Sequence, residues 1–356
     1  MTEHSTALPS DVPSGTRAAR PAASAASRVL VGSVTLNPAI DVTYEVPALT
    51  VDDVVRVRRV RSRAGGKGVN VAAVARALGA DPWALVLTGG RGGAELLDGL
   101  VALGIDVLDV DALSDVRRTV AVVADDGTTT SLQELGHDVR DSGRLAEQVL
   151  DAVDLLLAKG VRAVAVSGSL PPLCPVDLPA AIVRRCREAG VPVVADTSGA
   201  ALAAVARTGA ILTPNRAELA ELTGVPSTTE AELVAAGRRL LDAGAPAVVV
   251  TLGPDGVLAV TPDGVFAARP PEAVTGNATG AGDSAVAALL THLAHADGAP
   301  EASSVNWPAA LADMVATSAA CVLSPVAGEI NPAARADWLP RVHVRPITQE
   351  TTTHER

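Results

Sequence analysis

Residues 163–196 read AVAVSGSLPPLCPVDLPAAIVRRCREAGVPVVAD. The apolar run at 163–167 predicts a buried strand, residues 179–189 have the spacing of an amphipathic helix, and residues 191–196 predict a second strand. A strand, a helix and a strand in this order form a βαβ unit, in which the two strands run parallel. This stretch therefore predicts an α/β fold around a mostly parallel sheet.

The same alternation continues on both sides of this stretch. Short apolar runs predict further strands at 29–35, 84–87, 211–213, 247–251 and 257–261. Longer segments of helical period predict helices at 70–78, 94–103, 143–159, 216–223, 230–243, 282–295 and 307–322. The pattern favours one large α/β domain over residues 28–343.

Two segments interrupt the alternation and resemble each other. Residues 42–63 and 117–135 alternate polar and apolar side chains and contain turn signals such as Asp126-Gly127. We expect them to pair into a small separate β-sheet. Such a sheet is a natural candidate for a lid, because a lid must be half exposed when it is open.

Charge and composition exclude two classes of partner. The chain of 356 residues carries 29 Lys and Arg against 40 Asp and Glu, a net charge of −11, and its aromatic residues are three tryptophans, one tyrosine and one phenylalanine. A nucleic-acid binder needs the opposite charge or several exposed rings. No apolar run approaches the ~18 residues that a membrane helix requires. We therefore expect neither nucleic acid nor a membrane among the partners.

The two ends of the chain and its cysteines indicate a cytoplasmic protein. Residues 1–27 are rich in Ser, Ala and Pro and lack the apolar stretch of a secretory signal, so we expect a disordered tail. Residues 344–356 are similarly polar and are expected to form a second tail. Cys174, Cys186 and Cys321 lie far apart, which predicts neither disulfides nor a thiolate zinc site.

Three glycine-rich turns lie beside expected helix starts, at residues 64–70, 88–93 and 277–284. Unpaired backbone N–H groups and the helix dipole favour bound anions at such places. Neither a Walker A loop nor Gly-x-Gly-x-x-Gly directly after a strand is present, so the usual nucleotide fingerprints are absent. The glycine-rich turns therefore predict anion chemistry of another kind.

Asp283 follows two glycines in the first turn of an expected helix. A carboxylate there can accept a proton while neighbouring N–H groups hold a developing anion. Asp is also a favoured helix N-cap, and spacing alone favours the cap. Both interpretations stay open at this point.

Three further positions carry a functional and a structural interpretation. Asn215 and Glu218, three residues apart at a strand-to-helix junction, can position a hydrated Mg²⁺ or form a capping box. Lys67 and Arg117 can grip a phosphate or can be solvated surface charges. Spacing alone favours the structural interpretation in each case.

Six motifs together resemble the ribokinase-like (PfkB) sugar-kinase family, and more closely its phosphosugar branch, the 1-phosphofructokinases and tagatose-6-phosphate kinases. They are TLNPAID at 35–41, AGGKGVN at 64–70, SGSLP at 167–171, NRAE at 215–218, TLGPDG at 251–256 and GAGD at 280–283. Each motif alone is weak, but six in the family's order are specific. The resemblance covers roughly residues 29–330 and implies a three-layer α/β sandwich with a central mostly parallel sheet and a small β-sheet lid.

The resemblance also implies a role for individual residues. On the sugar side it implies contacts from Asp41, Gly65, Gly66, Lys67, Asn70 and Ser169, with Arg117 on the substrate phosphate. On the nucleotide side it implies an ATP site lined by Asn215, Thr251, Gly253 and Gly256, with Glu218 and Asn215 holding Mg²⁺ through water. Gly280, Ala281 and Gly282 then form an anion hole, and Asp283 is the catalytic base.

The implied activity is ATP-dependent phosphorylation of a sugar phosphate, and fructose 1-phosphate is the first choice because TLNPAID favours the phosphosugar branch. Tagatose 6-phosphate, fructose 6-phosphate, an unphosphorylated sugar, or a non-catalytic sugar-phosphate sensor are the alternatives. Departures from the family pattern at Val116 and Ala121 leave the sugar open, and Arg118 could replace Arg117 as the phosphate anchor. The resemblance further implies a homodimer through the lid.

Overall fold

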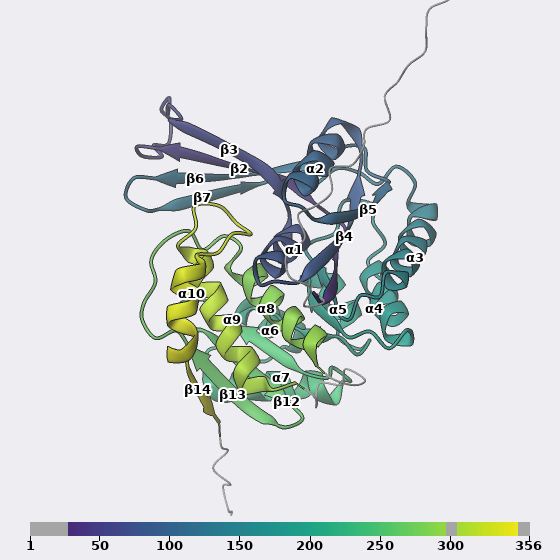
Figure 1. Cartoon of the computed structure of the whole chain (residues 1–356), viewed down its shortest axis with the longest axis vertical. Helices are drawn as coiled ribbons and strands as arrows, with labels where there is room; N and C mark the ends of the chain where they lie inside the picture. Colours follow the sequence, from purple (N-terminus) through teal and green to yellow (C-terminus); the bar gives the residue numbers. More distant parts are fainter. Residues whose placement is uncertain (1–27, 297–304, 348–356) are drawn as a thin grey trace, which may run out of the picture.

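The computed structural model describes residues 28–296 and 305–347, and these form two sheets with helices around them (Figure 1). The expected N-terminal tail, residues 1–27, lies outside the described residues. Within the described ranges, no helix has the length and apolar character needed to cross a membrane.

The larger sheet has ten strands in the order β14-β13-β12-β11-β10-β9-β8-β1-β4-β5. The parallel part comprises β1 (Leu30–Thr35), β4 (Asp81–Thr88), β5 (Asp106–Asp111), β8 (Val164–Ser167), β9 (Val193–Asp196), β10 (Ile211–Leu212) and β11 (Val248–Thr251). An antiparallel edge comprises β12 (Val257–Thr261), β13 (Gly264–Arg269) and β14 (His343–Pro346). The expected mostly parallel sheet is confirmed.

Helices cover both faces of this sheet and make it the middle of three layers. One face packs on α3 (Ser142–Ala158), α4 (Leu178–Glu188), α5 (Gly199–Val205), α6 (Arg216–Thr223) and α7 (Glu230–Asp242). The other face packs on α1 (Lys67–Ala77), α8 (Ala281–His295) and α9 (Trp307–Val322), with α10 (Pro332–Trp338) against α9. Because both faces are covered, β8 and β9 are buried along their whole length, which is why their sequences are apolar up to Ser167 and Asp196 at their carboxyl ends.

The smaller sheet has four strands in the order β3-β2-β6-β7. Its strands are β2 (Ala39–Val46), β3 (Arg59–Gly65), β6 (Arg117–Ala124) and β7 (Thr129–Gln133). Ile40 and Val42 point to one face and pack in a cluster with Leu96 of α2 (Gly90–Ala102), whereas Asp41 between them points to the other face. This alternation explains the polar-apolar pattern, and the expected small sheet is confirmed.

The boundary of the expected C-terminal tail at residue 344 is wrong. Residues 343–346 form β14, which pairs with β13 so that Val344 lies opposite Ala268. Val344 packs against the buried cluster of the α8 and α9 face, and the polar neighbours face outward. One apolar residue between polar ones is enough for an edge strand but is easily taken for a tail. Residues 348–356 lie outside the described residues.

Candidate active site

The candidate site is a cleft of two adjoining cavities, a polar one of about 430 Å³ and a more apolar one of about 550 Å³. They lie at the carboxyl ends of the parallel strands, where open α/β sheets place their ligands. The small sheet contributes Asp41, Arg117 and Thr119 to the polar cavity. Asn215, Thr251 and Gly282 line both cavities, so the two cavities adjoin.

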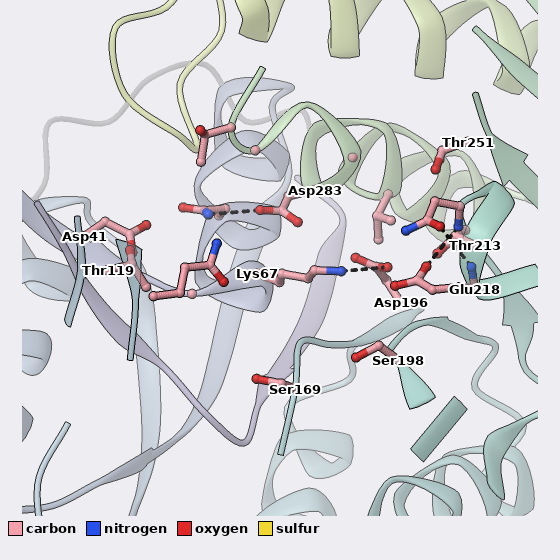
Figure 2. Close-up of a pocket in the computed structure, with 18 of the residues that line it drawn as sticks. Asp41, Lys67, Thr119, Ser169, Asp196, Ser198, Thr213, Glu218, Thr251 and Asp283 are labelled. Atoms are coloured by element: carbon pink, nitrogen blue, oxygen red, sulfur yellow. Dashed lines mark hydrogen bonds and ion pairs between the residues drawn. The ribbon is translucent and has the colours of Figure 1, made fainter. Parts of the chain in front are cut away.

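Most of the residues expected from the sequence meet in this cleft, and many of them appear in Figure 2. The polar cavity is lined by Asp41, Gly66, Lys67, Asn70, Arg117, Ser169, Asn215, Glu218, Thr251, Gly280, Gly282 and Asp283. Gly253, Gly256 and Ala281 line the apolar cavity. Gly65 lines neither cavity, but a Cβ atom there would come within 2.1 Å of the carboxyl group of Asp41, so this glycine makes room for that side chain.

Asp283 is buried in the first turn of α8, with 6% of its surface exposed. Asn70 Nδ2 donates a hydrogen bond to its Oδ2 at 2.9 Å. Burial raises the pKa of Asp283 to about 7, although the charge of Lys67 opposes the shift. The alternative of a helix N-cap is wrong, because Gly280 occupies the N-cap of α8 and Asp283 bonds to Asn70 instead. The carboxyl group is therefore placed to exchange a proton near neutral pH.

The glycines before Asp283 shape the start of α8. Gly280 has a φ of 83° in the left-handed region, and a Cβ atom there would lie 2.9 Å from the Cβ of Ala327. At Gly282 a Cβ atom would meet nothing within 4 Å, so the missing side chain leaves open space in the cleft. N–H groups in the first turn of a helix have no intrahelical acceptor. They can therefore hold an anion that enters this space.

Lys67 and Asp196, which both line the polar cavity, form an ion pair, with Nζ 3.2 Å from Oδ1. Burial alone would lower the pKa of Lys67, but the carboxylates of Asp196, Asp283 and Glu218 raise it above its usual value. Lys67 therefore keeps its positive charge in the cleft. Sequence reasoning missed Asp196, although its position at the carboxyl end of an expected parallel strand was a usable signal.

Asp41 reaches the cleft from the first half of β2, as the third residue of that strand. Thr119 on the neighbouring strand β6 donates to its Oδ1 at 2.5 Å, and the two residues are paired in register. Burial raises the pKa of Asp41, while Thr119, Arg63 and Arg117 work against that shift. Thr119 was also missed, although it stands two residues after Arg117 and thus on the same face of β6.

Arg117 and its neighbour Arg118 point to opposite faces of β6, as successive strand residues do. Arg117 lines the polar cavity, and its Nε and Nη1 donate to the carbonyls of Asn37 at 3.3 Å and Glu134 at 2.9 Å. Burial lowers its pKa, and Asp41 and Glu134 oppose that shift. The Arg118 guanidinium instead pairs with Glu95 at 2.8 Å outside the cleft. Of the two arginines, only Arg117 is in position to contact a ligand there.

Asn215 and Glu218 form the capping box at the start of α6, so the structural interpretation is confirmed. Asn215 Oδ1 accepts from the N–H groups of Ala217 and Glu218, and Glu218 Oε2 accepts from the Asn215 N–H at 2.9 Å. Both residues also line the polar cavity. The box therefore fixes a carboxylate at the cleft and does not exclude a ligand role.

The donor set of this region fits a hydrated Mg²⁺. Glu218 and Asp196 bring two carboxylates to one cavity, and oxygen ligands of this kind suit Mg²⁺, which usually keeps several of its waters. Among the described residues, no group of three or more His, Cys, Asp or Glu side chains forms a cage for a metal. Contacts through water and through ligand phosphates agree with such a site.

The apolar cavity suits a ligand group that is largely apolar. Its walls include Pro254, Val257, Val274, Val315 and Val322. Its volume of about 550 Å³ lies within the usual range of ligand sites. Gly256 has a φ of 88°, and a Cβ atom there would lie 2.0 Å from the carbonyl oxygen of Ala268, so only glycine fits this turn. A ligand whose apolar part lies here can extend toward Gly282.

Comparisons with known proteins identify the family and the fold that the chain matches. A model of the pfkB family of carbohydrate kinases matches residues 26–327. Escherichia coli phosphofructokinase-2 in complex with potassium is 24% identical with a TM-score of 0.77, over 88% of this chain and 98% of that one. A Thermotoga maritima protein provisionally identified as a 1-phosphofructokinase is 23% identical with a TM-score of 0.77, over 90% and 100%. Arabidopsis thaliana ribokinase complexed with ribose and ATP is 19% identical with a TM-score of 0.65, over 88% and 98%. These structures confirm the ribokinase-like fold.

Proposed function

The chain belongs to the pfkB family of carbohydrate kinases, and we propose that its substrate is a sugar phosphate, with fructose 1-phosphate as the first choice. A kinase of this family transfers a phosphoryl group from ATP to a sugar hydroxyl. From fructose 1-phosphate the product is fructose 1,6-bisphosphate. Tagatose 6-phosphate and fructose 6-phosphate are the next candidates, because each also presents a phosphate and free hydroxyls.

The pairing of the Arg117 side chain is the observation that supports a phosphorylated substrate. Its side chain is held by two neutral backbone carbonyls, and among the described residues no carboxylate lies within ion-pair distance of it. A partly buried guanidinium that no carboxylate contacts directly can make a charge-assisted bidentate contact with phosphate. Arg118, in contrast, is already paired with Glu95.

In the proposed reaction, Asp283 takes the proton of the accepting sugar hydroxyl. The hydroxyl oxygen bonds to the γ-phosphorus of ATP, the bond from that phosphorus to the bridging oxygen breaks, and ADP leaves. A base with a pKa of about 7 suits this transfer near neutral pH. The N–H groups in the first turn of α8 stabilise the negative charge on the transferred group. Phosphoryl transfer relies mainly on such positioning and charge stabilisation.

The remaining residues divide between the two substrates. Asp41, Gly66, Asn70 and Ser169 contact the sugar, with Gly65 making room for Asp41, and Lys67 contacts the phosphates between the two ligands. Thr251, Gly253 and Gly256 contact ATP. Glu218 and Asn215 would hold Mg²⁺ through water, and the bound metal would neutralise phosphate charge.

We also propose that the protein is cytoplasmic and forms a homodimer through the lid. Cys174, Cys186 and Cys321 are free and buried, as is usual in a reducing compartment. Val60 on β3 and Leu132 on β7 are 59% and 60% exposed on the lid face that points away from Asp41. Such apolar side chains on two edge strands favour contact with another chain.

The test is a coupled ADP-release assay with purified protein. The panel contains fructose 1-phosphate, tagatose 6-phosphate, fructose 6-phosphate, and free fructose and ribose. We expect the highest kcat/KM with fructose 1-phosphate and poor use of both free sugars. Efficient use of fructose or ribose would refute the phosphosugar proposal, and binding of a sugar phosphate without turnover would favour a sensor.

Arg117→Ala with Arg118→Ala as the matched control tests the phosphate anchor. Loss of the Arg117 contact should raise the KM for the sugar phosphate by ~10-fold or more and leave the KM for ATP nearly unchanged. Arg118→Ala should change neither by more than ~2-fold, because exposed ion pairs contribute little. Equal increases in both KM values would instead place Arg117 at the nucleotide.

A further inference from the structure

Asn37 lies between β1 and β2, is only 2% exposed, and does not line either cavity. Its side-chain Nδ2 donates to the carbonyl of Leu135 at 2.9 Å and to Ser169 Oγ at 3.1 Å. A weaker contact reaches the carbonyl of Leu170 at 3.4 Å. One carboxamide therefore ties the segment that leaves the lid to the loop that carries Ser169.

The backbone of the same residue is tied to Arg117. The Asn37 carbonyl accepts from Arg117 Nε at 3.3 Å, and the Glu134 carbonyl, next to Leu135, accepts from Arg117 Nη1 at 2.9 Å. Arg117 is thus held between two carbonyls whose separation depends on the bond from Asn37 Nδ2 to Leu135. The contact from Nδ2 to Ser169 places that hydroxyl relative to the same two carbonyls.

The chain around Asn37 is shaped to this arrangement. Gly136 has a φ of 116°, and a Cβ atom there would lie 2.6 Å from Asn37 Oδ1. The segment after β7 thus packs directly against the carboxamide, which only glycine permits in this conformation. A buried donor with several acceptors converging on it is costly to remove, because each acceptor loses its partner. The contacts of Asn37 therefore act as one unit.

We propose that Asn37 is a positioning residue that sets the spacing between Arg117 and Ser169 and so makes the cleft fit a phosphorylated sugar. The inference rests on the proposed function, because Arg117 is taken as the phosphate anchor. Asn37 contacts no substrate and acts through the two residues that do. Its loss should weaken binding of the sugar phosphate and leave the chemical step and the ATP site intact.

The experiment compares Asn37→Ala and Asn37→Leu with the control Asn331→Ala. The Leu variant keeps the approximate shape and lacks the donor, and Asn331 caps α10 through a bond to Ala334 N at 3.1 Å, away from the cleft. For the best sugar phosphate of the panel, we expect both Asn37 variants to raise KM by ~10-fold, with kcat and the KM for ATP within ~3-fold of wild type. Asn331→Ala should lower Tm and leave both KM values unchanged. A drop in Tm with unchanged KM in both Asn37 variants would overturn the proposal.

A double-mutant cycle with Arg117→Ala separates this inference from the proposed function. If Asn37 acts through Arg117, Asn37→Leu should raise the sugar-phosphate KM much less in the Arg117→Ala background than in wild type. Fully additive effects would refute the positioning role even if Arg117 is the anchor. If Arg117→Ala alone has no selective effect on the KM for the sugar phosphate, the proposed role of Arg117 as the phosphate anchor is refuted, whatever the Asn37 variants show.

Discussion

Asp283 is held where its ionised form is disfavoured, because burial raises its pKa from 3.8 to about 7. Between these pH values the folded chain keeps a proton that the unfolded chain has released, so ionisation of Asp283 lowers stability as the pH rises. We expect Asp283→Asn to lower kcat by ~10²-fold or more, because the amide cannot accept the proton. At pH 8 its Tm should equal or exceed that of wild type. Near-normal turnover would show that another group is the base.

The pH dependence of turnover offers an independent test of the base. Protonation of Asp283 should reduce kcat/KM as the pH falls through about 7. Lys67 lowers the pKa of Asp283, so Lys67→Met should move this acidic limb to higher pH. The substrate phosphates titrate alike with both enzymes, so the difference between the two profiles reports the protein. If the acidic limb of Lys67→Met lies at the same pH as that of wild type, the assignment of Asp283 as the base is contradicted.

Glu218 combines capping with the metal role, and the chain offers a matched control for separating them. Glu218→Gln should keep the capping box, since Gln can also accept the N-cap N–H, but hold a hydrated Mg²⁺ less strongly. We expect the Mg²⁺ concentration for half-maximal activity to rise several-fold with little change in Tm. Glu232→Gln alters the corresponding box of α7, which lies outside both cavities, and should leave the Mg²⁺ titration unchanged. Identical titrations for the two variants would leave capping as the only role of Glu218.

At the residue scale, the sequence predicted the site residues that lie in recognisable turns. It missed the site residues whose position depends on contacts with residues far away in the sequence. Lys67 and Asp283 stand in glycine-rich turns, whereas Asp196 gains its significance from an ion pair with a residue 129 positions away. The spacing at Asn215 and Glu218 predicted both a capping box and a ligand site, and the structure contains the box at the edge of the cleft. Spacing within one turn predicts local hydrogen bonds, but not which residues share a cavity.

At the element scale, β3 of the small sheet is connected to the N-terminal end of α8 through Arg63. Its Nη1 donates to the Ala327 carbonyl and lies 3.7 Å from Glu329 Oε1. The residues after α9 pack in turn on Gly280, where an added Cβ atom would lie 3.1 Å from the Gly328 nitrogen. The position of the lid strand and the shape of the turn before Asp283 therefore depend on one another.

Arg63→Met should consequently lower kcat by ~10-fold, because the turn that holds the transferred charge loses its support. Arg61 stands two residues earlier on the same face of β3 and pairs with Glu45 inside the lid at 3.1 Å. Arg61→Met therefore serves as the control and should keep kcat within ~2-fold. The measurement is kcat from steady-state kinetics at saturating ATP and sugar phosphate. An equal loss of kcat in the two variants would argue against a specific link through Arg63.

The elements that the sequence predicted are those with a strong period or a continuous apolar run. The helix expected at 216–223 matches α6, and buried strands such as β8 and β9 were found almost whole. The short helix α5, the half-exposed strand β5 and the polar edge strand β14 were missed. These elements bury few side chains each, so tertiary pairing rather than local pattern decides their conformation.

At the scale of the whole molecule, the cleft exists because two sheets meet above the carboxyl ends of the parallel strands. The carboxyl ends of β8 and β9 bring Ser167 and Asp196 side by side, and the small sheet adds Asp41 and Arg117 to the polar cavity. The net charge of the chain is −11, but its polar cavity is lined by the cations Lys67 and Arg117, which can attract an anionic ligand. The order of the motifs along the sequence predicted this fold. How the two sheets meet could not be predicted in the same way, because it depends on long-range packing.

The outer face of the lid sheet, β3-β2-β6-β7, leads to a prediction about the oligomeric state of the protein. Val60 and Leu132 lie on the two edge strands β3 and β7, and both are more than half exposed. Analytical ultracentrifugation at micromolar concentration should give twice the 35.8 kDa of the chain. The pair of substitutions Val60→Lys and Leu132→Lys should produce monomers, because charges on both edges oppose strand-to-strand contact.

The matched control for this prediction is Leu155→Lys on α3, which replaces a comparably exposed side chain, 57% exposed, on a helix away from the lid. It should leave the sedimentation coefficient unchanged. Because β2 of the same lid carries Asp41, we also expect the monomeric variant to bind the sugar phosphate several-fold more weakly, with an unchanged KM for ATP. A wild-type protein that sediments as a monomer would refute the proposed dimer. A dimer that persists in the variant with both lysines would show that the contact between chains lies elsewhere.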